Sequence, residues 1–371
     1  MRPAAGIALL GLALVGCGGL FDAAPLYAPG VGFLLLGLLS AAWVALAARG
    51  ATIARELDAR HVVEQEPVPV RLTVRGGRAA PPLPVAVLED PLLEAPLRLP
   101  SAARSHRFAA TARFPRRGRL RVPPPTLALR DPFELARRRV RGSGEQELLV
   151  LPRTSPVAYA AGRGPDDRRD GGASALLGAT ATEVDGVRPY REGTPAARIH
   201  WPTLARGAGL TERRLRVEAD ARPLVVLDAR GAPSRDALDM AVRAAASLAL
   251  AFARGGGSAL LLPGERRPSA IGADLAGWPA AHVRLALVEG GAGTPAPALG
   301  GAGPRPGPLV YVAARRLDRL PGAVRAAARG EALLVVPGRI DGREAQFSVA
   351  GCSGYRVARR TLGAAGEAVA G

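Results

Sequence analysis

The stretch LVVLDARGAPSRDALDMAVRAAASLALAFAR, residues 224–254, decides the fold of the C-terminal half of the chain. Its first five residues are an apolar run that ends in Asp228, which predicts a buried strand. Ser234 can cap a helix that runs to about Arg254. An apolar stripe at helical spacing supports that helix: Leu238, Ala241, Val242, Ala245, Leu248, Ala249 and Phe252.

The same alternation continues toward the C-terminus. We expect further strands at 258–262, 309–313 and 332–336, and a helix at 320–329. Residues 278–288 are ambiguous, and the Gly/Pro/Ala-rich stretch 290–308 predicts a surface excursion. Strands that alternate with helices predict an α/β domain with a mostly parallel sheet and helices on both faces.

The N-terminus carries two long uncharged runs, Pro3 to Phe21 and a second run with its core at 31–48. A helix of 18 residues is about 27 Å long, close to the ~30 Å of a bilayer's hydrocarbon layer. Turn formers without arginine separate the two runs, and the arginines that flank their outer ends are Arg2, Arg49, Arg55 and Arg60. The positive-inside rule therefore predicts a two-helix transmembrane hairpin (1–50) in the inner membrane, with the soluble domains in the cytoplasm.

An alternative for the first run is a lipoprotein signal, because Leu14-Val15-Gly16-Cys17 fits a lipid-modification box. Cys17 is therefore a candidate lipidation site. The second helix would still return the chain to the cytoplasm.

The formal charge of +18 comes from arginine alone, since all fifty basic residues are Arg. Together with abundant Ala, Gly and Pro, this usage indicates a GC-rich coding sequence. A basic surface can face anionic lipid headgroups or nucleic acid. The aromatic content of 4%, with no basic stripe interleaved with aromatics, argues against nucleic acid.

Residues 55–152 contain short β-like runs bounded by Pro and Gly, which predict an antiparallel β-sandwich of around seven strands. The runs are 68–75, 83–88, 106–113, 119–129 and 148–151. The charge-dense stretch 113–121 is interpreted as a solvated edge strand, with a phosphate or partner site as the alternative. Residues 153–182 predict a flexible linker, and the last domain covers 183–371.

The most distinctive motif lies between Asp185 and Arg206, in the order R-x-Y-x-x-G-x-x-x-R-x-I-x-W-x-x-x-A-R. With the charged strand 210–218, the apolar strand 224–228, Arg117-Gly118 and Asp131-Pro132-Phe133, it resembles the bacterial domain of unknown function 58 (DUF58) family. The resemblance covers nearly the whole chain.

That resemblance implies an N-terminal hairpin, a β-sandwich and a von Willebrand factor A-like α/β domain. It also implies a MoxR-type AAA+ ATPase as partner and a role in assembly or chaperone-like maturation, without enzymatic activity. Two acids of the family motif are replaced here, by Thr194 and His200.

Arginine suits bidentate contacts with carboxylates or phosphates, so the motif is a candidate site for an anionic partner. The candidate partner-binding residues are Arg188, Tyr190, Arg191, Arg198, Trp201 and Arg206. The alternative is that the arginines tie a long loop to the domain while Tyr190 and Trp201 pack beneath it. We interpret Trp201 as a core residue rather than a stacking platform.

A von Willebrand-type metal site would place an Asp at the strand end, where Asp228 falls, with hydroxyls at +2 and +4. Those positions hold Arg230 and Ala232, and an arginine would repel a cation. We therefore expect a degenerate site without metal, with Ser234 as the one hydroxyl that could rescue it.

Enzyme signatures are missing from the sequence: it has no Gly-x-Ser-x-Gly elbow, no paired His/Glu metal motif and no phosphate loop. Cys352 in Gly-Cys-Ser-Gly could imitate a nucleophile turn, but no histidine is placed to activate it. We expect a membrane-anchored, non-enzymatic scaffold without cofactors. The alternatives are a hydrolase of unrecognised type, or a basic envelope protein that binds nucleic acid or anionic lipid.

Overall fold

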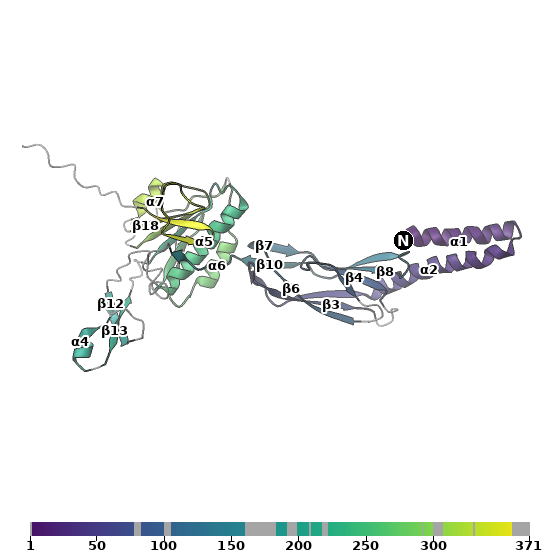
Figure 1. Cartoon of the computed structure of the whole chain (residues 1–371), viewed down its shortest axis with the longest axis horizontal. Coiled ribbons are helices and arrows are strands. Elements are labelled where there is room, and N and C mark those ends of the chain that lie inside the picture. Colours follow the sequence, from purple (N-terminus) through teal and green to yellow (C-terminus); the bar gives the residue numbers. More distant parts are fainter. Residues whose placement is uncertain are drawn as a thin grey trace, which may run out of the picture. The chain divides into compact units, whose positions relative to one another are not determined.

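The computed structural model shows a chain of two compact units (Figure 1). Unit 1 comprises 1–115 and 119–150, and unit 2 comprises 116–118 and 151–371. The residues that the structure describes are 2–77, 83–99, 105–159, 183–190, 199–207, 209–216, 222–291, 293–299, 307–328 and 331–357.

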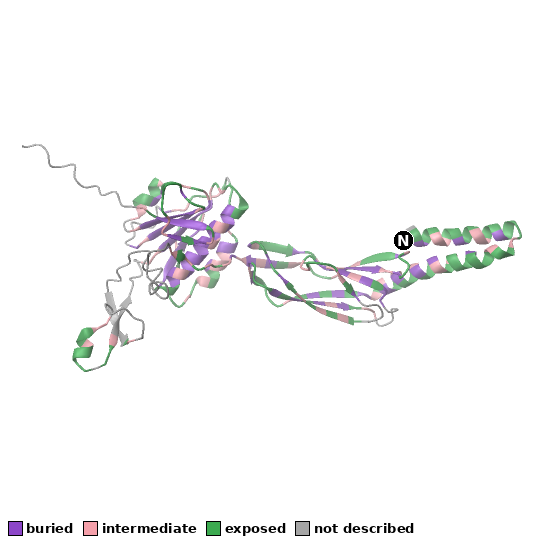
Figure 2. Ribbon diagram, viewed as in Figure 1, coloured by how far each residue is buried: buried purple, intermediate pink, exposed green. Residues whose placement is uncertain are grey.

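Unit 1 begins with two antiparallel helices, α1 (Arg2–Leu20) and α2 (Tyr27–Gly50), joined by the 3-10 turn η1 (Ala24–Leu26). The apolar segments Pro3–Leu20 and Ala24–Gly50 have mean hydropathies of 1.9 and 2.2. Most of their residues are exposed or half-buried, and the buried ones are spread along both helices (Figure 2). Both helices are long and apolar enough to cross a membrane, as the sequence predicts.

Glycines allow the backbones of α1 and α2 to approach closely. A Cβ atom on Gly11 would lie 2.4 Å from Leu34 N and 2.5 Å from Gly30 O, and one on Gly37 would lie 2.5 Å from Ala4 O. Such small-residue contacts hold transmembrane helices together where the hydrophobic effect cannot.

We expect Gly11→Leu to force α1 and α2 apart. The cost should be about 1–3 kcal/mol, as for other overpacked cores. Unfolding of the full chain by SDS in mixed micelles measures it. Gly32→Leu is the matched control, because a Cβ at Gly32 has no neighbour within 4 Å; equal losses in the two variants would contradict this packing.

Ten strands follow in the described part of unit 1. They are β1 (Thr52–Leu57), β2 (His61–Val63), β3 (Val68–Arg75), β4 (Val85–Glu89), β5 (Leu97–Leu99), β6 (Ser105–Ala112), β7 (Gly118–Val122), β8 (Thr126–Arg130), β9 (Arg137–Arg141) and β10 (Gln146–Leu151). They form sheets β1-β3-β6, β2-β10-β7 and β5-β4-β8-β9. The pairings in the first and third sheets are antiparallel.

One hydrophobic core serves all three sheets and the base of the hairpin. Leu72, Leu88 and Leu127 are fully buried in it, and Val44 and Ala47 of α2 join the same cluster. The helix ends are therefore packed into the β unit itself.

The predicted strand 119–129 is two strands in the structure. Pro123, Pro124 and Pro125 separate β7 from β8, because proline cannot donate to a ladder. Strands β1, β2 and β5 escaped prediction: β1 carries charged residues in place of regular apolar alternation, and β2 and β5 are only three residues long. Strand β9 follows Asp131-Pro132-Phe133, which the sequence suggests is a turn that starts a new strand.

Arg55, one of the arginines at the outer ends of the predicted hairpin, is buried in unit 1. It is 7% exposed and forms a 3.1 Å ion pair with Asp90. It also donates to Gln146 Oε1 at 2.9 Å and to the carbonyls of Val122 and Pro123. The charge of Arg55 is therefore neutralised by partners inside unit 1.

Unit 2 contains an eight-stranded sheet in the order β11-β19-β20-β18-β17-β14-β15-β16. Its strands are β11 (Ala158–Tyr159), β14 (Leu224–Asp228), β15 (Ser258–Leu261), β16 (Ser269–Ile271), β17 (Leu309–Ala313), β18 (Ala332–Pro337), β19 (Phe347–Val349) and β20 (Cys352–Val357). The four central strands are parallel, but all flanking pairings are antiparallel. The sheet is thus mixed rather than mostly parallel, because β19 and β20 form a hairpin at Ala350-Gly351, both with positive φ.

Helices cover both faces of this sheet, as predicted. Val225 and Leu227 of β14 share a core with α5 (Arg235–Arg254) and α6 (Trp278–Ala286). The alternate residues Leu224 and Val226 face a second core with α7 (Gly322–Ala327). The ambiguous stretch 278–288 is therefore mostly helix.

The predicted linker begins at residue 153, but its first residues are ordered in unit 2. Ser155 N donates to Ser247 Oγ at 2.9 Å, and β11 pairs with β19. The rest of the predicted linker, 160–182, lies outside the described residues.

Candidate functional site

The motif region forms a small module of two strands and a short helix. Strands β12 (Glu183–Pro189) and β13 (Thr211–Arg216) pair antiparallel, with a register shift between Val184 and Gly186. Helix α4 (Trp201–Ala205) lies between them in sequence. His200 N donates to Thr211 O at 2.8 Å and Tyr190 N to Leu210 O at 3.0 Å, so the backbone closes the module.

The module exposes large apolar side chains. Trp201 is 56% exposed, Leu204 38% and Leu210 39%. The prediction that Trp201 packs in the core is therefore wrong: α4 is a five-residue helix on a two-stranded sheet, too small to cover an indole. Tyr190 is half-buried. We name Trp201, Leu204 and Leu210 the apolar tip.

The polar motif residues are only partly described. Arg206 is exposed beside the apolar tip, and His200 Nδ1 contacts Thr203 Oγ1, one turn into α4. The backbone of Arg188 pairs opposite Glu212 in the β12–β13 ladder. Arg191, Thr194 and Arg198 lie outside the described residues.

Asp228 lies at the carboxyl end of β14 and is fully buried. Arg230 Nε donates to its Oδ1 at 2.8 Å and Arg230 Nη2 to its Oδ2 at 3.0 Å, a bidentate pair. Tyr311 Oη donates to Oδ2 at 2.5 Å, and Arg230 N donates to Oδ1 at 3.1 Å. The carboxylate therefore accepts four hydrogen bonds.

These contacts set the pKa values of the trio. Burial raises the pKa of Asp228, but the hydrogen bonds from Arg230 and Tyr311 outweigh it and hold that pKa below 3.8. The hydrogen bond with Asp228 raises the pKa of Arg230. Burial, and then the hydrogen bond to Asp228, raise the pKa of Tyr311. At neutral pH the site holds a carboxylate neutralised by an internal guanidinium.

The residue types around Asp228 do not suit a cation. Arg230 lies on the carboxylate, and Ser234 Oγ accepts Ala237 N at 3.1 Å as the cap of α5. Within the described residues there is no group of three His, Cys, Asp or Glu that could hold a metal. Tyr311 was not identified from the sequence as part of this site. Its hydroxyl lies in the middle of a buried apolar strand and therefore needs a buried hydrogen-bond partner.

Arg117 corrects the interpretation of 113–121 as a uniformly solvated edge. It belongs to unit 2 and is 6% exposed. Its Nε lies 2.8 Å from Asp239 Oδ1 of α5, and its Nη1 donates to the carbonyls of Leu285, Ala286 and Val288 at 2.9–3.1 Å. It therefore caps the C-terminus of α6. In the sequence, Asp239 stands among the apolar residues of 235–254, and a buried acid requires a basic partner such as Arg117.

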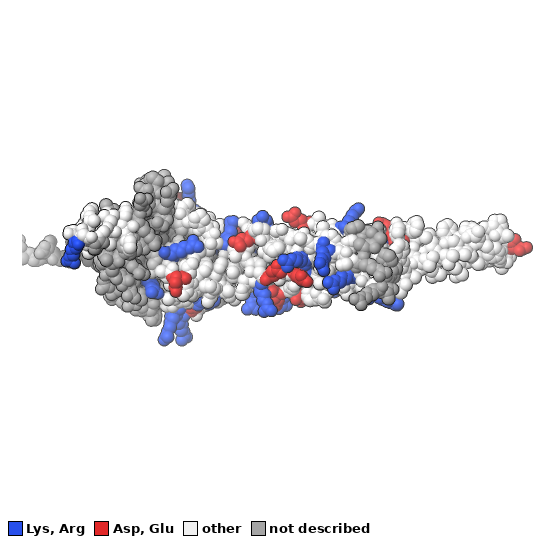
Figure 3. Space-filling view, turned by 90° about the horizontal axis from the view of Figure 1, so that it is seen from below, with Lys and Arg blue, Asp and Glu red and all other residues white. Residues whose placement is uncertain are grey.

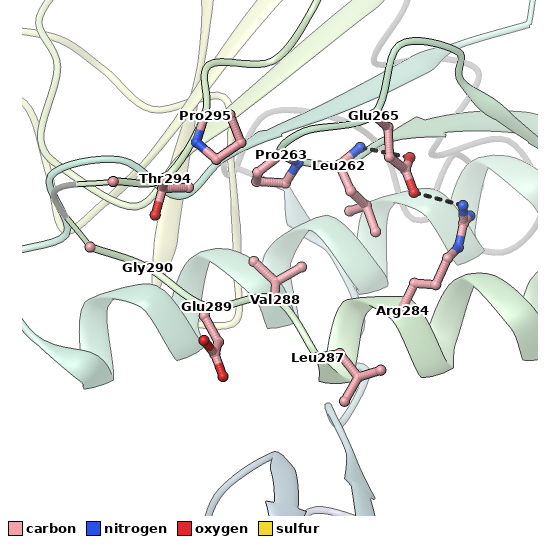
Figure 4. A pocket seen from close by; sticks show the side chains of 12 residues that line it. Leu262, Pro263, Glu265, Arg284, Leu287, Val288, Glu289, Gly290, Thr294 and Pro295 are labelled. Atoms are coloured by element: carbon pink, nitrogen blue, oxygen red, sulfur yellow. Dashed lines mark hydrogen bonds and ion pairs between the residues drawn. The ribbon is translucent and has the colours of Figure 1, made fainter.

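A pocket of about 510 Å³ lies beyond the carboxyl end of β15 (Figure 4). Leu262, Pro263 and Pro295 form apolar walls, and the pair Glu265–Arg284, at 2.7 Å, lies at one end. Glu265 also accepts Leu262 N at 3.2 Å, so its charge is held by the fold.

The two cysteines differ in environment. Cys17 is exposed on α1. Cys352 is fully buried in β20, where burial raises its pKa to about 12. A thiol with that pKa is protonated at neutral pH and is a poor nucleophile.

No protein-family model and no curated protein matches the sequence. Among solved structures, the chain is similar to Spo0M, a sporulation control protein from Bacillus subtilis, with 13% sequence identity and a TM-score of 0.17. The similarity covers 38% of this chain and spans 58% of that protein. A similarity this low supports no inference about fold or function.

Proposed function

We propose that the protein is a membrane-anchored, non-enzymatic scaffold of the DUF58 type. Helices α1 and α2 anchor it in the inner membrane, and its body lies in the cytoplasm. The body consists of a β-sandwich made by the strands of unit 1 and a von Willebrand factor A-like domain in unit 2. The β12–α4–β13 module docks a protein partner, for which the motif suggests a MoxR-type AAA+ ATPase.

The observation that carries this proposal is the apolar tip of the module. Trp201 and two leucines are exposed on one small element, beside an exposed arginine. Tryptophan and arginine are the residues most enriched among the side chains that dominate binding energy at protein interfaces. An apolar slot rimmed by carboxylates on the partner would complement this surface.

Two further observations support a scaffold over a hydrolase. Cys352 is buried and its thiolate is disfavoured, so it is unsuited to nucleophilic attack. The carboxylate of Asp228 is occupied by Arg230 and Tyr311. Both groups that the sequence offered for chemistry are thus engaged in the fold.

The anchor is supported by packing at its base. Ala4 is 2% exposed and its N donates to Leu135 O at 3.0 Å. Cleavage before Cys17, as in a lipoprotein, would remove this contact, so we favour the uncleaved hairpin over lipidation.

Removing the apolar tip should abolish partner capture. We expect Trp201→Ser/Leu204→Ser to reduce co-purification of the AAA+ ATPase with the full chain in detergent by at least about tenfold, because each such anchor contributes about 2 kcal/mol or more. Co-purification followed by quantitative immunoblotting measures this loss.

Leu287→Ser is the matched control, since Leu287 is equally exposed at 38% but lines the pocket of Figure 4. Loss of the partner in the control alone would move the docking site to the pocket. Equal retention in all three proteins would overturn docking through the module.

A further inference from the structure

The turn between β8 and β9 lies at the base of the hairpin. Leu135 O in this turn accepts the hydrogen bond from Ala4 N, in the first turn of α1. Leu135 and Val140 pack against the same core as Val44 and Ala47. The C-terminal side of the β8–β9 turn and strand β9 are thus fixed to the helix bases within unit 1.

The position of Ala4 sets the level of this turn relative to a membrane. The apolar span of α1 begins at Pro3 and covers 18 residues. That length, about 27 Å, nearly matches the hydrocarbon layer, so Ala4 lies at one boundary of the layer. A turn bonded to Ala4 then lies among the lipid headgroups.

Hydrogen bonds of Asp131 hold the turn, which exposes one large apolar side chain. Asp131 is 1% exposed, and its carboxylate accepts Phe133 N at 3.1 Å and Ala136 N. Its own N donates to Ala136 O at 3.2 Å. Phe133, held by this turn, is 65% exposed. An exposed aromatic ring suits the interfacial layer better than water.

Arginines flank the turn. Arg130 and Arg137 are register partners in β8 and β9, and the next residue is Arg138. Arg130 is paired with Glu134 at 3.5 Å, and Arg139 lies 3.9 Å from Glu89. Arg137 and Arg138 are exposed and form no ion pair with any described residue. On the face in Figure 3, charged side chains are scattered over the body next to the helices, whereas the helices carry charge only at their tip.

We propose that this turn, with Phe133 and the flanking Arg137 and Arg138, is a binding site for the headgroups of anionic phospholipids. The inference rests on the membrane anchor in the proposed function but not on the protein partner. The guanidinium groups bind lipid phosphates, and Phe133 enters the interfacial layer beside them. The site fixes the depth of unit 1 at the membrane surface.

A fluorescent label at position 133 tests the location of the turn. The full chain carries Phe133→Cys with Cys17→Ala, and a maleimide-linked nitrobenzoxadiazole probe reacts there because Cys352 is buried. In vesicles with phosphatidylglycerol we expect a blue-shifted emission and quenching by brominated lipid. The control label replaces Glu66, which is exposed next to the end of β3 farther from α2, and should stay water-exposed.

The headgroup preference is tested by Arg137→Gln/Arg138→Gln. The ratio of phosphatidylglycerol to phosphatidylcholine retained by the full chain after detergent extraction should fall about fivefold for each arginine removed. Arg119→Gln/Arg121→Gln on β7 removes the same charge from exposed positions and should leave the ratio unchanged.

Two outcomes would overturn the inference: a water-exposed label at position 133 in both phosphatidylglycerol and phosphatidylcholine vesicles, or equal loss of the lipid ratio in the two arginine variants. An equal blue shift in phosphatidylcholine alone would still place the turn at the interface, and the arginine variants alone then decide the headgroup preference. Extraction of the whole chain by alkaline carbonate would instead show that the anchor itself is wrong. A chain that stays in the membrane but carries a water-exposed label at position 133 would contradict only the headgroup site.

Discussion

Arg230→Ala should destabilise unit 2 by about 3 kcal/mol at neutral pH, because it leaves the Asp228 carboxylate buried without its cation. This is the low end of the range for breaking a buried pair. We choose it because the side chain of Arg230 is 34% exposed, so water can enter the gap. Chemical denaturation of the full chain in detergent, followed by tryptophan fluorescence, measures the loss.

The pH dependence of this loss identifies its cause. In the parent protein, the pKa of Asp228 is lower in the folded than in the unfolded state. Asp228 therefore contributes stability above its unfolded pKa, and this stability is lost as the pH falls through the folded pKa. Without Arg230, burial raises that pKa, and the variant should lose stability as the pH rises. The difference between the two proteins should therefore be smaller at pH 4.5 than at pH 7.5.

Arg230→Ala/Asp228→Asn is the matched control, since it removes the buried charge together with its partner. We expect it to recover most of the stability at pH 7.5 and to show no such pH dependence. A loss from Arg230→Ala that is the same at both pH values would rule out an unpaired carboxylate as its cause.

Arg117→Met should cost about 3–5 kcal/mol, the largest effect we expect from a single substitution. Arg117 and Asp239 have side-chain exposures of only 4% each, so Asp239 would be left as a buried charge. Three carbonyls at the end of α6 would lose their donor as well. The midpoint of chemical unfolding measures the effect.

Arg117→Met/Asp239→Leu separates the two contributions. An apolar pair of similar volume often replaces a buried ion pair without loss, so this variant should recover the part due to the unpaired charge. The part due to the uncapped α6 should remain. Arg116→Met is the control, because its 3.0 Å pair with Asp236 is exposed and should contribute at most about 1 kcal/mol. Equal losses in Arg116→Met and Arg117→Met would contradict the buried network.

The parts of the fold that the sequence predicts well are those with local signals. The strand 224–228 and the helix to Arg254 carry an apolar run, a serine cap and a helical stripe within 31 residues, and the structure has both with those bounds. The alternation of 68–75 likewise gives β3. The charged strand β9 has no apolar alternation of its own. Its edge position is set by its neighbours β8 and α2 rather than by a local pattern in β9.

The candidate site was less predictable because burial depends on partners distant in sequence. Arg117 looks like its neighbours Arg116 and Arg119 in sequence, and only α5 and α6 make it a buried residue. Trp201 looks like a core residue by type, yet its module has too little surface to cover it. Arg230 was predicted to exclude a cation, but its bidentate geometry on Asp228 required coordinates.

The hydrogen bond between Ala4 and Leu135 has a consequence for synthesis of the protein on the ribosome. The two helices are complete at Gly50, whereas the strand that closes their base ends 91 residues later, at Arg141. At about 5–20 residues per second, the hairpin waits roughly 5–18 s before this base can close. If the hairpin is the membrane anchor that we propose, its insertion into the bilayer therefore precedes folding of unit 1, and the β core closes around a hairpin that is already inserted.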